Sequence, residues 1–157
     1  MKNVKGEDID GRPLAGRLMI LTDWQIFVVV NLFGFFWPGT KIRRFTEALI
    51  FLPRKQGKTS FAAALVEAKS VMDCASGSET YIVANSLKQT RESFAFLNEN
   101  ISEKRKDYKK LRVLDNNQEH SLYIDYGCGT AKIFAIANQE ERLDSLNCNC
   151  LILDDLP

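Results

Sequence analysis

The sequence predicts an α/β protein with a mostly parallel sheet flanked by helices. Residues 48–52 and 81–84 are short runs that are apolar on both faces, as buried parallel strands are. Helical patterns follow them over residues 61–73 and 86–101. A third apolar run, residues 151–153, lies near the end of the chain. Strand, helix, strand, helix, strand is the order of a parallel α/β sheet.

Local signals support the remaining elements. Residues 22–32 predict a helix, and Thr22 with Gln25 has the spacing of a capping box. Ser86 with Gln89 repeats that spacing. Two further apolar runs, residues 122–126 and 131–136, are separated by a glycine-bearing turn and predict a hairpin. The stretch before them, residues 102–112, is strongly charged.

Composition excludes several classes of protein. The 157 residues are 45% hydrophobic, which excludes a disordered chain, and 21 Lys and Arg against 20 Asp and Glu exclude a globally basic surface. The longest apolar run, residues 26–37, is too short to span a bilayer, so we expect no membrane partner and a cytosolic location. The four cysteines form no CxxC pair, which argues against zinc and for thiols in a reducing compartment; they are Cys74, Cys128, Cys148 and Cys150.

The segment between the first strand and its helix carries the chemistry. Gly57, Lys58 and Thr59 have the order of a phosphate loop, which indicates a P-loop NTPase-like fold. Gly57 lets the backbone approach phosphates, Lys58 neutralises them, and the Thr59 hydroxyl is a ligand for Mg²⁺. The usual pattern begins with Gly where this chain has Leu52. The triplet alone also fits an ordinary surface turn, so the flanking strand and helix matter.

The last strand supplies a second half of such a site. Asp154 follows residues 151–153, where a carboxylate can hold Mg²⁺, and Asp155 stands where a second carboxylate can polarise the attacking water. The alternative is that both residues only end a strand before a turn. We expect Asp154 and the turn at Gly57 to lie side by side at the carboxyl edge of one sheet.

These residues resemble the large terminase subunit of tailed bacteriophages. The resemblance runs along nearly the whole chain. It rests on the following groups of residues: Trp24-Gln25, Arg43-Arg44-Phe45, Pro53-Arg54-Lys55-Gln56-Gly57-Lys58-Thr59-Ser60, Ala62-Ala63-Ala64, residues 81–85 with Gln89, residues 144–147 and residues 151–155. The family's phosphate loop often lacks the first Gly and carries Arg near its start, so Leu52 and Arg54 favour terminase over a generic nucleotidase.

The resemblance implies an ATPase motor that moves double-stranded DNA into a procapsid. ATP and Mg²⁺ are the implied cofactors, and the implied partners are the portal protein, the small terminase subunit and further copies in a homo-oligomeric ring, in the host cytoplasm. The implied nucleotide contacts are Trp24, Gln25, Arg54, Lys55, Gln56, Gly57, Lys58, Thr59 and Ser60. Thr59 and Asp154 would hold the metal, and Lys58, Arg54 and Asp155 would act on the transferred phosphate.

Two departures from the family pattern bear on activity. The family has Asp-Glu on its acidic strand, whereas Asp155 is one methylene shorter, which leaves a disabled nucleotide-binding module as an alternative. The nuclease domain that follows in the family is not in this sequence. We therefore expect an arm over residues 1–20 and a partial P-loop ATPase domain over residues 21–157, truncated after the Mg-binding strand. A helicase-like P-loop ATPase is a further alternative.

Several residues keep two interpretations. Gln25 either contacts adenine or completes its capping box. Arg142 either reaches a neighbouring subunit or pairs with a nearby carboxylate. A basic cluster either touches DNA phosphates or is a solvated face; it consists of Lys104, Arg105, Lys106, Lys109, Lys110 and Arg112.

Overall fold

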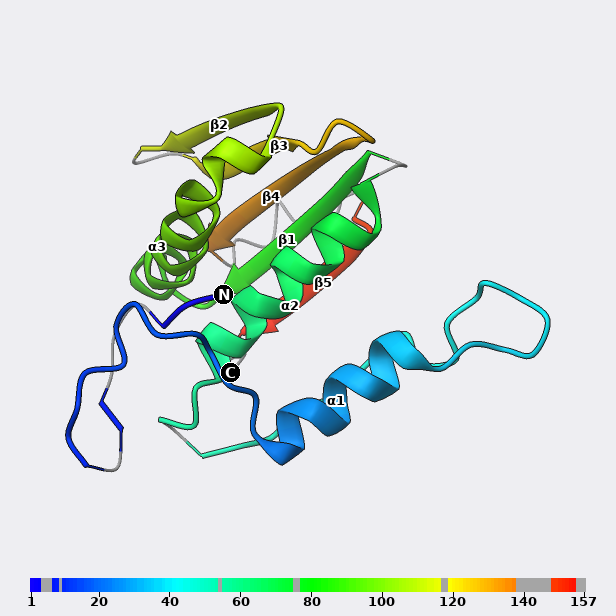
Figure 1. Ribbon diagram of the computed structural model, residues 1–157, viewed down its shortest axis with the longest axis horizontal. Helices are drawn as coiled ribbons and strands as arrows, with labels where there is room; N and C mark the ends of the chain where they lie inside the picture. Colours follow the sequence, from blue (N-terminus) through cyan, green and yellow to red (C-terminus); the bar gives the residue numbers. More distant parts are fainter. Residues whose placement is uncertain are drawn as a thin grey trace.

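The computed structural model is an α/β fold built on one five-stranded sheet (Figure 1). It describes residues 1–3, 7–8, 10–53, 55–74, 77–116, 119–137 and 148–154. The elements in chain order are α1 (Asp23–Gly34), α2 (Lys58–Met72), β1 (Ser78–Ala84), α3 (Leu87–Glu103), the short 3-10 helix η2 (Arg105–Asp107), β2 (Lys110–Asp115), β3 (His120–Asp125), β4 (Thr130–Ala137) and β5 (Cys150–Asp154).

The sheet is mixed, so the prediction of a mostly parallel sheet is confirmed only in part. Its strand order is β2-β3-β4-β1-β5. Strand β1 pairs in parallel with β4 and with β5, whereas β3 is antiparallel to both β2 and β4. The turns that join β2 to β3 and β3 to β4 are too short for the crossover that a parallel pair needs. The predicted hairpin is therefore confirmed as β3–β4, and it continues into β2.

Strand β2 arises where the sequence showed mainly charge. Its side chains alternate between half-buried and exposed over most of its length, with Leu111 and Val113 packed against the core and Lys110 and Arg112 in solvent. Alternation of this kind is typical of an edge strand. The many charged residues made this alternation of apolar and polar side chains hard to recognise in the sequence.

The predicted strand over residues 48–52 is wrong. These residues belong to no strand, and Leu49 and Phe51 are 97% and 96% exposed. The segment connects the turn after α1 to the loop before α2 without joining the sheet (Figure 1). An apolar pattern shows that a run can be buried, but it does not supply the neighbouring strand that buries it.

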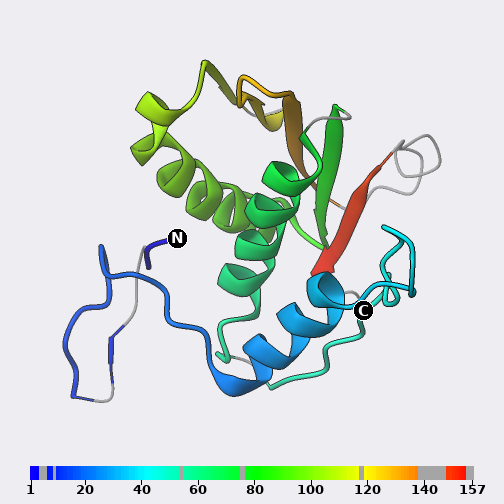
Figure 2. The same cartoon turned by 45° about the vertical axis from the view of Figure 1, so that its right-hand side comes forward.

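The core lies between the sheet and two helices on one of its faces (Figure 2). Helices α2 and α3 pack side by side on this face, and their buried residues meet apolar residues of β1, β3 and β4. The amino-terminal end of α3 is capped as predicted, since the Ser86 hydroxyl accepts a hydrogen bond from the Gln89 amide at 3.3 Å. Helix α2 begins directly after Gly57.

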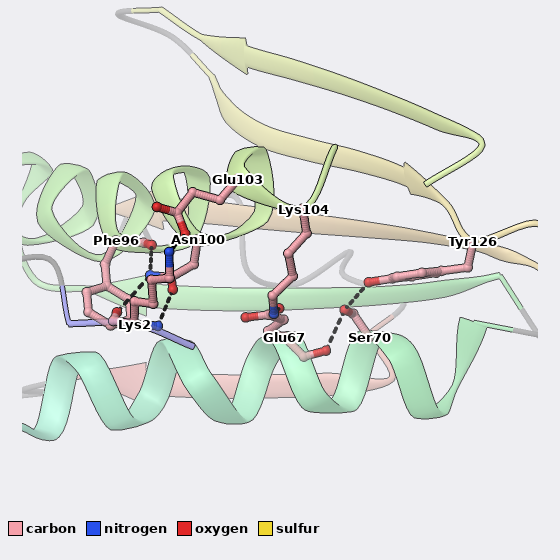
Figure 3. Close-up of polar contacts among 8 residues, drawn as sticks. All are labelled: Lys2, Glu67, Ser70, Phe96, Asn100, Glu103, Lys104 and Tyr126. Atoms are coloured by element: carbon pink, nitrogen blue, oxygen red, sulfur yellow. Dashed lines mark hydrogen bonds and ion pairs between the residues drawn. The ribbon is translucent and has the colours of Figure 1, made fainter. Parts of the chain in front are cut away.

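Helix α1 packs outside this core, whereas Met1 packs against it. The Trp24 ring meets the Phe61 ring edge-on, with centroids 5.1 Å apart, so α1 touches the first turn of α2. At the amino terminus, the Lys2 amide donates to Asn100 Oδ1 at 2.6 Å, which fastens these first residues to α3 (Figure 3). Within the described part of the chain, no helix is both long and apolar enough to cross a membrane.

The packing predicts a large cost for truncating Phe94. This ring on α3 is 1% exposed, and Phe94→Ala is expected to lower the free energy of unfolding by about 3–5 kcal/mol because it leaves a cavity. Phe27 on α1 is 70% exposed, so Phe27→Ala is the matched control and should change it by about 0.5 kcal/mol or less. Urea unfolding measures both. Equal losses in the two variants would contradict this placement of the core.

Candidate nucleotide site

The loop that enters α2 has two residues in the left-handed backbone region. Gly57, the residue just before the helix, has φ 72°, which costs a glycine nothing. Lys55 has φ 67°, and it is the one non-glycine residue with positive φ in the described part of the chain. Such strain is uncommon for a side-chain-bearing residue and clusters at ligand sites.

The loop brings the Lys58 ammonium and the first backbone amides of α2 close to the turn at Gly57. The Lys58 Nζ donates to the Leu52 carbonyl at 3.3 Å, so the side chain spans the mouth of the turn. The first amides of α2 lack partners within the helix, and its positive end attracts anions. The Ser60 hydroxyl donates to the Gly57 carbonyl at 3.0 Å, which links the turn to the first turn of α2.

The expected closeness of the loop and the acidic strand is confirmed. The Thr59 hydroxyl donates to Asp154 Oδ2 at 3.1 Å, although the two residues are 95 positions apart. The register of the parallel strands explains where Asp154 lies. Asp154 pairs with Ala84, the last residue of β1, so both lie at the carboxyl edge of the sheet, where the loop also lies.

This pair of oxygen atoms fits one side of a magnesium site. Mg²⁺ takes one or two protein oxygens and keeps water or phosphate at its other positions. A hydroxyl and a carboxylate in direct contact have the right chemistry and spacing for two adjacent ligands. Among the described residues no cluster of three or more His, Cys, Asp or Glu side chains could hold a metal alone, so phosphates or water would have to complete this one.

Trp24 and Gln25 make structural contacts near the start of α2. Trp24 packs on Phe61 in the first turn of α2. Gln25 is buried, and its Oε1 accepts from the Thr22 amide at 2.9 Å, which is the capping-box contact. The structure therefore gives both residues a structural role close to the phosphate loop, and contact with adenine stays a prediction.

Three predicted residues lie outside the part of the chain that the structure describes: Arg54, Arg142 and Asp155. Of the other loop residues, Lys55 and Gln56 are exposed, and Gln56 lies between the two left-handed residues Lys55 and Gly57. Of the predicted nucleotide and metal residues, the structure brings together Lys58, Thr59 and Asp154 at one sheet edge.

The family model of the ATPase domain of the terminase large subunit matches residues 23–157. The chain belongs to this family. The match begins just before Trp24 and runs through the loop and the acidic strand, so the terminase ATPase domain contains every residue of the candidate site. It also decides for terminase over the helicase alternative. No curated protein and no solved structure matches the chain.

The basic cluster of this terminase domain is divided by the structure. Lys104 Nζ lies 2.6 Å from Glu67 Oε1, a carboxylate on the buried face of α2 (Figure 3). Lys104 therefore ties α3 to α2. The remaining members are exposed along η2 and the edge strand β2: Arg105, Lys106, Lys109, Lys110 and Arg112.

Loss of the Lys104 ammonium is expected to destabilise the terminase domain. Lys104→Ala leaves the Glu67 carboxylate buried without this donor, which should lower the free energy of unfolding by about 1–3 kcal/mol. Lys106→Ala, two residues along and fully in solvent, should stay within about 0.5 kcal/mol of the parent. Chemical denaturation measures both, and indistinguishable curves would mean that Lys104 belongs with the solvated charges.

Sequence reasoning missed the contacts on the buried face of α2. Glu67 lies among the buried residues Ala63, Val66 and Ser70 of α2. A carboxylate on an otherwise apolar helix face indicates a buried charge that needs a partner, and this pattern could have predicted one. The Ser70 hydroxyl lies 3.0 Å from the Tyr126 hydroxyl, just after β3 (Figure 3). Burial raises the pKa of Tyr126, with Glu67 adding to the shift, so this phenol stays protonated as a donor at neutral pH.

Proposed function

We propose that this domain hydrolyses ATP and that hydrolysis drives double-stranded DNA into a phage procapsid. The observation that supports the proposal most is the contact between Thr59 and Asp154 at the end of a phosphate loop. Family membership supports the same reading, since the matched domain is named an ATPase. DNA transport is inherited from the family resemblance.

In this proposal the residues have separate roles. The loop amides and Lys58 hold the β- and γ-phosphates, and Lys58 leaves the Leu52 carbonyl when phosphate arrives. Thr59 and Asp154 would hold Mg²⁺, which would supply positive charge to neutralise the phosphate oxygens. The residues Lys55, Gln56, Gly57 and Ser60 shape the loop, and Trp24 and Gln25 border the base.

Two further roles rest on the sequence pattern alone. Asp155 orients the attacking water and takes its proton, and Arg54 approaches the γ-phosphate. Arg142 is a candidate for completing the site of a neighbouring copy in a ring. The ring would act with the portal protein and the small terminase subunit in the host cytoplasm, and the exposed basic residues of η2 and β2 would contact DNA phosphates without reading sequence.

The test is release of inorganic phosphate from Mg²⁺-ATP by the purified chain, with and without double-stranded DNA. Multiple turnovers that require Mg²⁺ support the proposal. Binding of a fluorescent ATP analogue without turnover would instead support the disabled module that the short Asp155 side chain suggests. Asp155→Glu separates these outcomes, because restoring the missing methylene should then raise the rate. Absence of any nucleotide binding would overturn both readings.

A further inference from the structure

Two thiols meet at the far end of α2 from the phosphate loop. Cys74 Sγ lies 3.3 Å from Cys128 Sγ, and the residues are 54 positions apart. Cys74 follows the last turn of α2 and is buried, whereas Cys128 is exposed in the turn between β3 and β4. The sulfur atoms are thus closer than two non-bonded atoms of this size usually pack, and one of them is open to solvent.

Neighbouring contacts hold the two segments in this arrangement. The hydroxyls of Ser70 and Tyr126 lie 3.0 Å apart and join the last part of α2 to the start of the same turn (Figure 3). The Tyr126 amide donates to the Gly129 carbonyl at 2.9 Å and closes the turn around Cys128. Approach of the sulfurs to bonding distance therefore needs a shift of little more than 1 Å rather than a rearrangement of the fold.

We propose that Cys74 and Cys128 are a reversible dithiol that a small disulfide oxidises to an intramolecular disulfide. The exposed Cys128 thiolate attacks one sulfur of the oxidant, forms a mixed disulfide and expels one thiolate. Cys74 then loses its proton and attacks Cys128 Sγ, which expels the second thiolate, and that thiolate takes the proton. The protein loses two electrons and two protons, and the oxidant becomes two thiols.

The other two cysteines provide an internal comparison. Cys148 is exposed and Cys150 is half-buried at the start of β5. Burial raises the pKa of the Cys150 thiol, which makes it a poorer nucleophile at neutral pH. The proposal assigns the disulfide to Cys74 and Cys128 because their sulfur atoms are 3.3 Å apart, and not to a pair chosen by exposure alone.

The test is equilibration of the whole chain in buffers of reduced and oxidised glutathione, followed by alkylation, digestion without reduction and mass spectrometry. The expected product is one cross-linked peptide pair containing Cys74 and Cys128. The fold already holds the two thiols together, whereas the unfolded chain must first close a loop between residues 54 positions apart, so the bond should be favoured by about a thousandfold over the same chain in urea. The readout does not involve nucleotide, so it is independent of the proposed ATPase activity.

Two variants sharpen the test. Cys128→Ser changes an exposed residue, so it should fold normally and lose the cross-link. The double variant Cys148→Ser with Cys150→Ser should keep it. A glutathione adduct that persists on Cys128, a bond that includes Cys148 or Cys150, or equal equilibrium constants in native and unfolded chains would each overturn the proposal.

Discussion

Replacing Lys58 with alanine is expected to lower ATP turnover at least about 100-fold. The ammonium bridges the loop, where it lies 3.3 Å from the Leu52 carbonyl. A neutral methyl leaves the charge that develops on the transferred phosphate without this partner. Steady-state phosphate release at saturating Mg²⁺-ATP measures the loss.

The control for Lys58 is a lysine of equal charge elsewhere. Lys41 is exposed in the turn after α1, so Lys41→Ala should keep the parental rate. Circular dichroism should show that both variants retain the parental helix content, because Lys58 opens α2 and alanine favours a helix. Retained turnover in Lys58→Ala would show that this loop lysine takes no part in ATP hydrolysis.

Asp154→Asn is expected to cut Mg²⁺-dependent turnover by about 100-fold. An amide oxygen has no net charge, so the variant keeps the shape of the 3.1 Å contact with Thr59 but loses the anion that attracts the metal. The matched control is Asp125→Asn. Asp125 also ends a strand, but β3 runs antiparallel to β4, so this carboxylate lies at the opposite edge of the sheet.

Thr59 provides the second half of this experiment. Thr59→Val removes the hydroxyl at nearly constant shape and should raise the Mg²⁺ concentration for half-maximal rate by about tenfold or more. Thr59→Ser keeps the hydroxyl and should stay near the parent. If Thr59→Val and Thr59→Ser needed the same Mg²⁺ concentration, the contact between Thr59 and Asp154 would have only a structural role.

The contacts that were predictable from sequence are those set by local rules. The capping contact of Gln25 follows from a spacing of three residues. The meeting of Thr59 and Asp154 spans most of the chain, and only half of the predicted reason for it holds. Asp154 lies at the carboxyl edge, as the rule for parallel strands predicts, whereas Thr59 follows no strand and lies there because α2 begins at that edge and leads back into β1. The action of these two oxygens on nucleotide and metal stays a prediction.

The features that could not be predicted depend on non-local packing. Residues 48–52 have the pattern of a buried strand, but burial requires a neighbour that the pattern does not name, and Phe51 remains in solvent. The pairing of Cys74 with Cys128 depends on how a turn docks onto α2, which no spacing encodes. Lys104 carries the same charge as its neighbours, and only the buried Glu67 distinguishes it.

The proposed phosphate and metal site is best tested by a crystal structure with Mg²⁺ and a non-hydrolysable ATP analogue. We expect a metal about 2.1 Å from the Thr59 hydroxyl, on the side that faces Asp154, with the Lys58 ammonium moved from the Leu52 carbonyl onto phosphate. A triphosphate bound away from the Gly57 turn, or a metal that contacts neither Thr59 nor Asp154, would contradict the proposed site.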